Sequence, residues 1–251
     1  EETNRRIVDI ISDVNMAYSE HARRYLADCG FPKERTYVTG SPMAEVLHNN
    51  LTEIGASDVH QRLGLEKGNY ILLSAHREEN IDTEKNFISL FLAINKMAEK
   101  YDMPILYSCH PRSRNRLAAS GFQLDPRVIQ HEPLGFHDYN CLQMNAFAVV
   151  SDSGTLPEES SFFTSVGHPF PAICIRTSTE RPEAIDKGDF IIAGIDEKSL
   201  LQAVDTAVEL CQNGQHGIPV PDYSDENVST KVVKIVQSYV GIVNKMVWRK
   251  F

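Results

Sequence analysis

The chain has 251 residues, of which 42% are hydrophobic and 24% are charged, and its formal net charge is −9 at pH 7. These values are typical of a globular protein, and the acidic balance argues against nucleic-acid binding, which needs clustered Lys and Arg. Five widely spaced cysteines and the lack of a long apolar run predict a cytoplasmic protein with no disulfide framework, zinc knuckle or membrane span.

The first forty residues alternate between helix and strand. A helical period of Ile and Val predicts a helix over residues 2–12, and residues 14–18 follow as a strand. Ser19 is expected to cap a second helix that stops at Gly30. Residues 36–39 then form a second strand, so the chain begins with two strand-and-helix units.

A Gly-Ser-Pro at residues 40–42 is the expected domain boundary, because a strand ends there and a helical pattern restarts. The next predicted strands are residues 70–75, 104–108, 128–130, 146–150, 172–176 and 190–193. The predicted helices are residues 84–100, 112–117, 139–145, a helix opening near 155, 197–211 and 228–248. Strands alternating with helices predict an α/β fold with a parallel sheet.

The segment from residue 146 to residue 161 passes from a buried strand into a polar turn and then into a helix. Thr155, with Glu158 three residues later, is predicted to form a capping box at the start of that helix. In an open α/β sheet such a corner lies at the carboxyl edge, where free N–H groups favour a phosphate. Glu159 has two interpretations: it accepts hydrogen bonds from a ribose diol, or it is a solvated first-turn acid.

Polar side chains also follow three other predicted strands. His76 and Arg77 follow the strand at 70–75, His110 and Arg112 follow the next strand, and Arg181 follows the strand that starts at residue 172. If these strands are neighbours, the residues form a pocket for a diphosphate sugar nucleotide. The alternatives are a capped loop histidine, ordinary helix capping, and a local ion pair at Arg181.

Two aromatic residues and several absent motifs narrow the ligand class. Phe136 and Tyr139 are equally compatible with a base-stacking surface and with the core. No G-x-G-x-x-G follows a strand and no G-x-x-x-x-G-K-[ST] occurs, which removes the usual support for dinucleotide or ATP binding. No convincing metal-ligand spacing is present, so no metal is predicted.

Five segments together resemble the non-hydrolysing UDP-N-acetylglucosamine 2-epimerase family: EETNR, YVTGSPMAEVL, SAHREEN, SDSGTLPEES and RTSTERPEA. Within the family, the last four resemble the bacterial branch that forms UDP-N-acetyl-L-fucosamine from its L-talo epimer for capsule or O-antigen synthesis. Thr155 stands where the glucosamine epimerases usually have a second Gly, and Glu78 also departs from their pattern.

The resemblance implies the glycosyltransferase-B arrangement, in which two Rossmann-like domains face each other. Residues 1–40 are then the tail of the N-terminal domain, residues 41–225 the C-terminal UDP-binding domain, and residues 226–251 a helix that crosses back. Because the chain opens on Glu1, without an initiator Met and with a helix under way, we expect it to begin inside a larger protein.

The family's reaction, as the resemblance implies it, expels UDP from C1 of the sugar as the C2 proton leaves, and then adds UDP back. His76 and Arg181 then hold the diphosphate with help from the amides after Ser153, and Glu159 holds the ribose. The expected UDP-binding residues are His76, Arg77, Tyr139, Ser153, Gly154, Thr155, Glu159 and Arg181, and the expected catalytic residues are Glu1 and His76. UDP and UDP-N-acetyl amino sugars are the expected ligands, without a cofactor, and a homodimer is expected for the full-length protein.

Three alternatives stay open at this point. The first is an epimerase that converts UDP-N-acetylglucosamine into UDP-N-acetylmannosamine. The second is a UDP-sugar glycosyltransferase, which shares the fold and the nucleotide site but needs an acceptor. The third is a half-protein that binds UDP and catalyses nothing.

Overall fold

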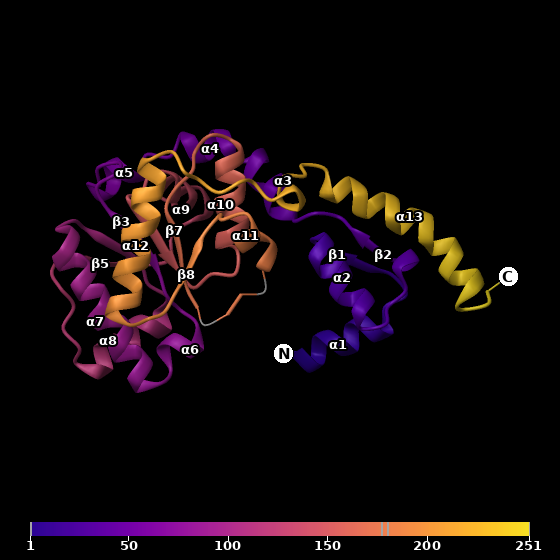
Figure 1. Ribbon diagram of the computed structural model, residues 1–251, viewed down its shortest axis with the longest axis horizontal. Coiled ribbons are helices and arrows are strands. Elements are labelled where there is room, and N and C mark those ends of the chain that lie inside the picture. Colours follow the sequence, from indigo (N-terminus) through magenta and orange to yellow (C-terminus); the bar gives the residue numbers. More distant parts are fainter. Residues whose placement is uncertain (1, 177, 180, 251) are drawn as a thin grey trace. The chain divides into compact units, whose positions relative to one another are not determined.

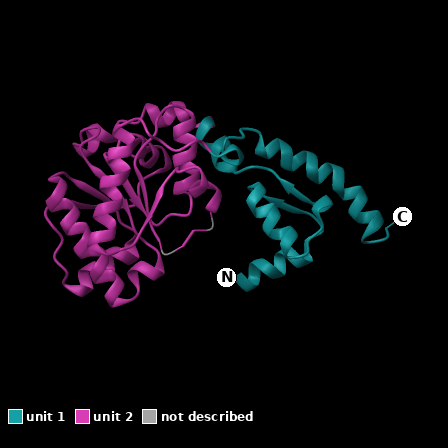
Figure 2. Cartoon of the chain, viewed as in Figure 1, with its two compact units in different colours: residues 1–48, 220–251 teal, residues 49–219 magenta. Residues whose placement is uncertain are grey.

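The computed structural model describes residues 2–176, 178–179 and 181–250. The chain divides into two compact units (Figure 2): unit 1 comprises residues 1–48 and 220–251, and unit 2 comprises residues 49–219. The expected boundary at residues 40–42 therefore lies inside unit 1. Among the described residues, no helix is both long and apolar enough to cross a membrane.

Unit 1 contains the two-stranded parallel pair β1-β2 and the helices around it. Its elements are α1 (Glu2–Ile11), β1 (Asn15–Ala17), α2 (Glu20–Asp28), the 3-10 helix η1 (Lys33–Arg35), β2 (Thr36–Val38), α3 (Pro42–Asn49), the 3-10 helix η2 (Pro221–Tyr223) and α13 (Val228–Met246). The Ser19 side chain accepts a hydrogen bond from the Ala22 N–H at 3.2 Å, which confirms the predicted cap. The Asp222 carboxylate accepts from the Glu20 N–H at 2.9 Å, so the returning chain is joined to the start of α2.

Unit 2 is built on a six-stranded parallel sheet (Figure 1). Its strands are β3 (Ile71–Ser74), β4 (Ile105–Ser108), β5 (Val128–His131), β6 (Ala148–Ser151), β7 (Ala172–Ile175) and β8 (Ile191–Ala193). They lie in the order β5-β4-β3-β6-β7-β8. The order runs outward from β3 in one direction and then restarts at β6 in the other, so the topological switch point lies between these two strands.

Nine helices are described in unit 2, and they connect and cover the strands. They are α4 (Leu51–Gly55), α5 (Val59–Leu63), α6 (Glu78–Ile81), α7 (Glu84–Tyr101), α8 (Pro111–Ser120), α9 (Phe136–Met144), α10 (Leu156–Ser165), α11 (Pro182–Asp186) and α12 (Glu197–Gln212). The predicted helices of this region are confirmed, whereas α4, α5, α6 and α11 are absent from the sequence-based prediction.

Alternate strand residues face opposite sides of the sheet, and both sides are buried. On one side, Ile71, Leu73 and Tyr107 belong to a core cluster that includes residues of α7 and α12. These two helices pack against each other on that face (Figure 1). On the other side, Leu72 and Val149 are fully buried. Burial on both faces explains why the strands are continuous apolar runs and why they stand out in the sequence.

Candidate functional site

Polar residues from four strands meet at the carboxyl edge of the unit 2 sheet. The strands β4, β3, β6 and β7 are consecutive neighbours, so the segments that follow them lie side by side. His76 and Arg77 follow β3, Ser153 follows β6, and Arg181 lies beyond β7. The adjacency that the pocket hypothesis required is therefore present, and its centre is the switch point, where open α/β sheets bind ligands.

Asp152 lies at the centre of this edge and is fully buried. Its Oδ2 atom accepts hydrogen bonds from the backbone N–H groups of His76 and Arg77, both at 2.9 Å. Oδ2 also accepts from the side-chain amide of Asn80 at 3.2 Å, and that amide donates in addition to the Ile175 carbonyl at 3.0 Å. One carboxylate thus joins the ends of β3, β6 and β7.

His76 lies beside Asp152 but remains open to solvent. Its side chain is 47% exposed, and Nδ1 is 3.1 Å from Oδ1 of Asp152. The carbonyl of the preceding residue, Ala75, accepts hydrogen bonds from the hydroxyls of Tyr107 at 2.8 Å and Ser113 at 3.2 Å. The backbone is therefore held on both sides of His76, and the imidazole projects from a fixed position.

The predicted capping box at Thr155 and Glu158 is wrong. Thr155 is the N-cap residue of α10, but its side chain makes no capping bond to the helix. Its hydroxyl instead lies 2.9 Å from Ser153 Oγ and donates to Glu159 Oε1 at 2.7 Å. The Thr155 N–H donates to Ser153 Oγ at 3.3 Å, so the reciprocal bond from Glu158 does not form.

Glu159 is buried at the first turn of α10, which excludes the solvated-acid alternative. Its Oε2 atom accepts from the Gln143 side-chain amide on α9 at 2.8 Å. Burial raises the pKa of Glu159; the bonds from Gln143 and Thr155 oppose the rise, and the nearby Glu158 adds to it. Each carboxylate oxygen has two lone pairs, so each retains room for one further donor.

Arg181 and Glu158 form an ion pair between the end of β7 and α10. Arg181 Nη2 lies 3.6 Å from Glu158 Oε2, and the side chains are 22% and 4% exposed. Glu180, one partner of the expected local pair within residues 180–183, lies outside the described residues. The guanidinium therefore points toward the first turn of α10.

Tyr139 and Gln143 lie four residues apart on α9 and share a helix face. Burial raises the pKa of the Tyr139 phenol, the Glu159 charge adds to the rise, and the hydroxyls of Ser151 and Ser74 oppose it. The phenol is therefore directed toward the switch point. Phe136, one turn earlier, is 40% exposed.

His110 and Arg112 have structural roles in the described chain. His110 is the N-cap of α8, and its Nδ1 accepts from the Arg112 N–H at 3.3 Å. The Arg112 guanidinium donates to Glu78 at 3.0 Å and to Asp82 at 2.6 Å. The capping alternative thus accounts for both residues.

One expected site residue lies outside the described chain, and three residues of the site were not expected. Glu1, the expected catalytic carboxylate, lies outside the described residues. Asp152, Asn80 and Gln143 organise the site but are absent from the sequence-based site list. An acid placed two residues after a continuous apolar run is the signal that points to Asp152, because such a position lies at the buried end of the strand.

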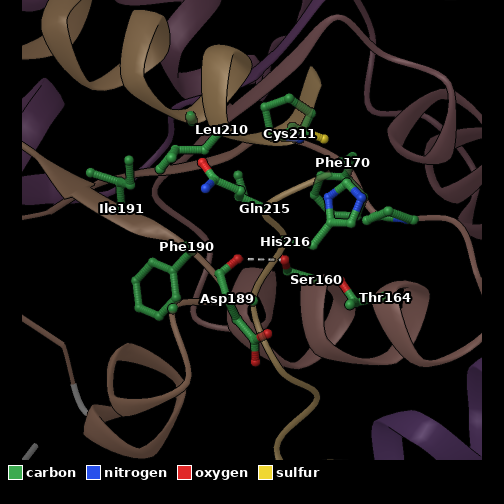
Figure 3. Close-up of a pocket in the computed structure, with 16 residues that line it drawn as sticks. Ser160, Thr164, Phe170, Asp189, Phe190, Ile191, Leu210, Cys211, Gln215 and His216 are labelled. Atoms are coloured by element: carbon green, nitrogen blue, oxygen red, sulfur yellow. Dashed lines mark hydrogen bonds between the residues drawn. The ribbon is translucent and has the colours of Figure 1, made fainter. Parts of the chain in front are cut away.

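A pocket at the opposite edge of the sheet has different chemistry (Figure 3). It lies where β7 and β8 begin, and Ser160, Phe170, Cys211 and His216 line it. Ser160 Oγ donates to the main-chain carbonyl of Asp189 at 2.7 Å. Asp189 also lines this pocket, and its carboxylate extends away from Gln215 and His216 (Figure 3).

The carboxyl edge, by contrast, combines groups that suit a nucleoside diphosphate. His76, Arg77 and Arg181 supply donors for an anion, and the start of α10 adds helix N–H groups. Glu159 supplies an acceptor for hydroxyl groups. The arrangement can therefore bind an anionic group and a diol side by side.

Comparisons with known proteins indicate the same class of ligand. The family model described as UDP-N-acetylglucosamine 2-epimerase matches residues 1–237. A UDP-N-acetylglucosamine 2-epimerase of Methanocaldococcus jannaschii is 28% identical over 221 residues, which cover 85% of this chain and 59% of the relative. One of Methanococcus maripaludis is 29% identical over 246 residues, which cover 94% of this chain and 64% of the relative. The chain thus spans about three fifths of these relatives.

Solved structures confirm the α/β fold with its parallel sheet. The UDP-N-acetylglucosamine 2-epimerase of Rickettsia bellii is 39% identical, with a TM-score of 0.88 over 99% of this chain and 66% of that chain. The M. jannaschii UDP-GlcNAc 2-epimerase, solved in complex with UDP-GlcNAc and UDP, is 26% identical, with a TM-score of 0.83 over 95% of this chain and 64% of that chain. The chain therefore belongs to the UDP-N-acetylglucosamine 2-epimerase family.

Proposed function

We propose that this chain carries the UDP site of a UDP-sugar 2-epimerase, and that UDP binds at the carboxyl edge of the unit 2 sheet. The observation that carries the proposal is the convergence of His76, Ser153, Glu159 and Arg181 at the switch point between β3 and β6. A related enzyme solved with UDP-GlcNAc and UDP supports the same ligand class.

In this proposal, His76, Arg77 and Arg181 neutralise the diphosphate, and the amides of Ser153, Gly154 and Thr155 add hydrogen bonds. Glu159 accepts from the ribose hydroxyls through the lone pairs that Gln143 and Thr155 leave open. Tyr139, whose phenol is near the Glu159 charge, completes the nucleotide site in this proposal. No metal ion or nicotinamide takes part.

The reaction begins with transfer of the C2 proton to a carboxylate. The C2–H electron pair forms a C1=C2 double bond as the C1–O bond breaks, and UDP leaves with the C1–O pair. Protonation of C2 from the other face, with return of a UDP oxygen to C1, completes the epimerisation. Stabilising the departing diphosphate is the part of this sequence that His76 and Arg181 perform. Glu1 is the proposed carboxylate by its motif position.

For the substrate, we propose the branch that interconverts UDP-2-acetamido-2,6-dideoxy-L-talose and UDP-N-acetyl-L-fucosamine, for capsule or O-antigen synthesis. The support is the sequence pattern at Glu78 and Thr155, together with the segments around them. The coarser possibility is UDP-N-acetylglucosamine 2-epimerisation. A homodimer of the full-length protein in the cytoplasm belongs to the same proposal.

The UDP site is tested by calorimetric titration of UDP into the chain and into its Glu159→Gln variant. Loss of the carboxylate charge weakens its bonds to two ribose hydroxyls, so we expect about a 10-fold to 100-fold loss of affinity. Glu197→Gln is the matched control, because Glu197 is an exposed first-turn acid on α12. Equal affinity of the Glu159→Gln variant and the wild type removes the ribose assignment.

The reaction is tested by incubating the full protein separately with the two UDP-sugars and detecting epimers by NMR. Turnover of UDP-N-acetyl-L-fucosamine supports the proposed branch, whereas turnover of UDP-N-acetylglucosamine alone contradicts it. Sugar transfer to an added acceptor, with no epimer formed in its absence, identifies a glycosyltransferase instead.

A further inference from the structure

The buried carboxylate of Asp152 presents two oxygens with unequal surroundings. Oδ2 accepts from three donors, namely the N–H groups of His76 and Arg77 and the Asn80 amide. Oδ1 is buried and has no aligned hydrogen bond among the described residues, yet it lies 3.1 Å from His76 Nδ1. A buried acceptor without a donor is costly, so Oδ1 favours a proton on Nδ1.

We infer that Asp152 fixes His76 in the tautomer that carries hydrogen on Nδ1 and leaves Nε2 facing outward. The inference rests on the proposed function, in which His76 acts on the diphosphate. With hydrogen on Nδ1, 3.1 Å from Asp152 Oδ1, the Nε2 atom is the one that faces a ligand. An Nε2–H on the positively charged ring donates to a phosphate oxygen of the leaving group, and the buried carboxylate balances the ring charge from behind.

Hydrogen bonds to neighbouring residues hold His76 and Asp152 in this arrangement. Ala75, one residue before His76, has its carbonyl held by Tyr107 and Ser113. Asn80 is held by the Ile175 carbonyl at 3.0 Å while it donates to Asp152. Asp152 therefore acts through His76 as a positioning residue, and its own atoms stay away from the ligand.

A purely structural role for Asp152 makes a different prediction, and the Asp152→Asn variant separates the two. Three donors surround the Oδ2 position, so the amide oxygen of Asn must occupy it. The amide nitrogen then occupies the Oδ1 position and faces Nδ1 of His76. Two donors cannot pair, so the ring is forced into the tautomer with hydrogen on Nε2. This ring still donates from Nε2, but it stays neutral, because a proton on Nδ1 would face the amide donor, and the leaving diphosphate loses a positive charge.

The test is the ¹⁵N–¹H spectrum of the chain labelled at its histidine rings, recorded at about pH 8, where imidazole is ordinarily neutral. The His76→Asn variant identifies the His76 signals. We expect hydrogen on Nδ1 in the wild type and on Nε2 in Asp152→Asn. A wild-type ring with hydrogen on Nε2, or in an even mixture of tautomers, overturns the inference without any need for a variant. Retention of the Nδ1 tautomer in Asp152→Asn overturns it as well.

Two further measurements keep this result separate from the proposed function. Calorimetry measures whether the wild type binds UDP. If His76 carries hydrogen on Nδ1 but UDP does not bind, only the proposed function is contradicted. In the full protein, Asp152→Asn should lower kcat by about 10²-fold to 10⁴-fold and change KM much less. A rise in KM of the same size, with kcat unchanged, indicates a role in loop structure alone and overturns the inference.

Discussion

Unit 2 contains two buried aspartates at opposite edges of one sheet, and their surroundings differ sharply. Asp152, at the carboxyl edge, is 0% exposed and accepts hydrogen bonds from three donors. Asp189, at the amino edge, is 6% exposed; neither carboxylate oxygen has an aligned hydrogen bond among the described residues, although the Ser161 hydroxyl lies nearby. Burial alone therefore does not identify a functional acid; the donors arranged around it do.

The surroundings of Asp189 show what an uncompensated carboxylate does. Burial raises the pKa of Asp189 to about 7, and the nearby Ser161 hydroxyl and Lys187 charge oppose the rise only in part. A Cβ atom on Gly217 would lie 2.6 Å from Asp189 Oδ1, so the backbone of Gly217 closes over the carboxylate. The free-energy cost of burying Asp189 is lowered when its carboxylate takes up a proton, whereas the cost of burying Asp152 is lowered by the hydrogen bonds that it accepts.

The largest expected effect is that of Asp152→Ala on stability. The substitution leaves two backbone N–H groups and the Asn80 amide without their acceptor. We expect a loss on the order of 4 kcal/mol in the free energy of unfolding, measured by urea denaturation at pH 8. Asp189→Ala is the matched control; because it removes an acid whose charged form destabilises the folded state at pH 8, we expect no loss. Equal losses for the two variants remove the distinction between the two acids.

The second effect is the pH dependence of Asp189→Asn. Because the folded pKa of Asp189 is raised from 3.8 to about 7, the folded wild type binds more protons than the unfolded chain in this window, and its stability falls as pH rises. The Asn variant does not lose stability in this way. Its free energy of unfolding, relative to that of the wild type, should therefore rise by about 1.4 kcal/mol per pH unit between roughly pH 4 and 7, and then level off. A relative stability that stays constant from pH 4 to 8 contradicts the raised pKa.

The smallest effect is expected from Arg112→Ala at the rim of the carboxyl edge. Its guanidinium pairs with Glu78 and Asp82, but all three side chains are substantially exposed. Exposed pairs of this kind contribute at most about 1 kcal/mol to stability, so the Tm should fall by only a few degrees. The affinity for UDP should stay within about 3-fold of the wild-type value. A larger loss of UDP affinity assigns Arg112 to the site.

Much of this molecule could be predicted from its sequence, because strands buried on both faces are continuous apolar runs. The runs at residues 146–150 and 172–176 place β6 and β7 within two residues at each end. Short helices such as α4 and α6 were missed because four or five residues carry too little periodicity. The capping box failed because Glu158 and Thr155 had stronger partners in Arg181 and Glu159, which tertiary contact alone supplies. Asp152 resembled an ordinary turn residue because its hydrogen-bond donors, at residues 76, 77 and 80, are far from it in the sequence.

UDP binding at the carboxyl edge is tested by a UDP titration of the ¹⁵N-labelled chain followed through its backbone amide signals. We expect saturable shifts at His76, Arg77, Ser153 to Thr155 and Arg181, with the amides of Asp189 and Gln215 to Gly217 unchanged. Shifts confined to the amino-edge residues, or saturation with no change at the carboxyl edge, would contradict it.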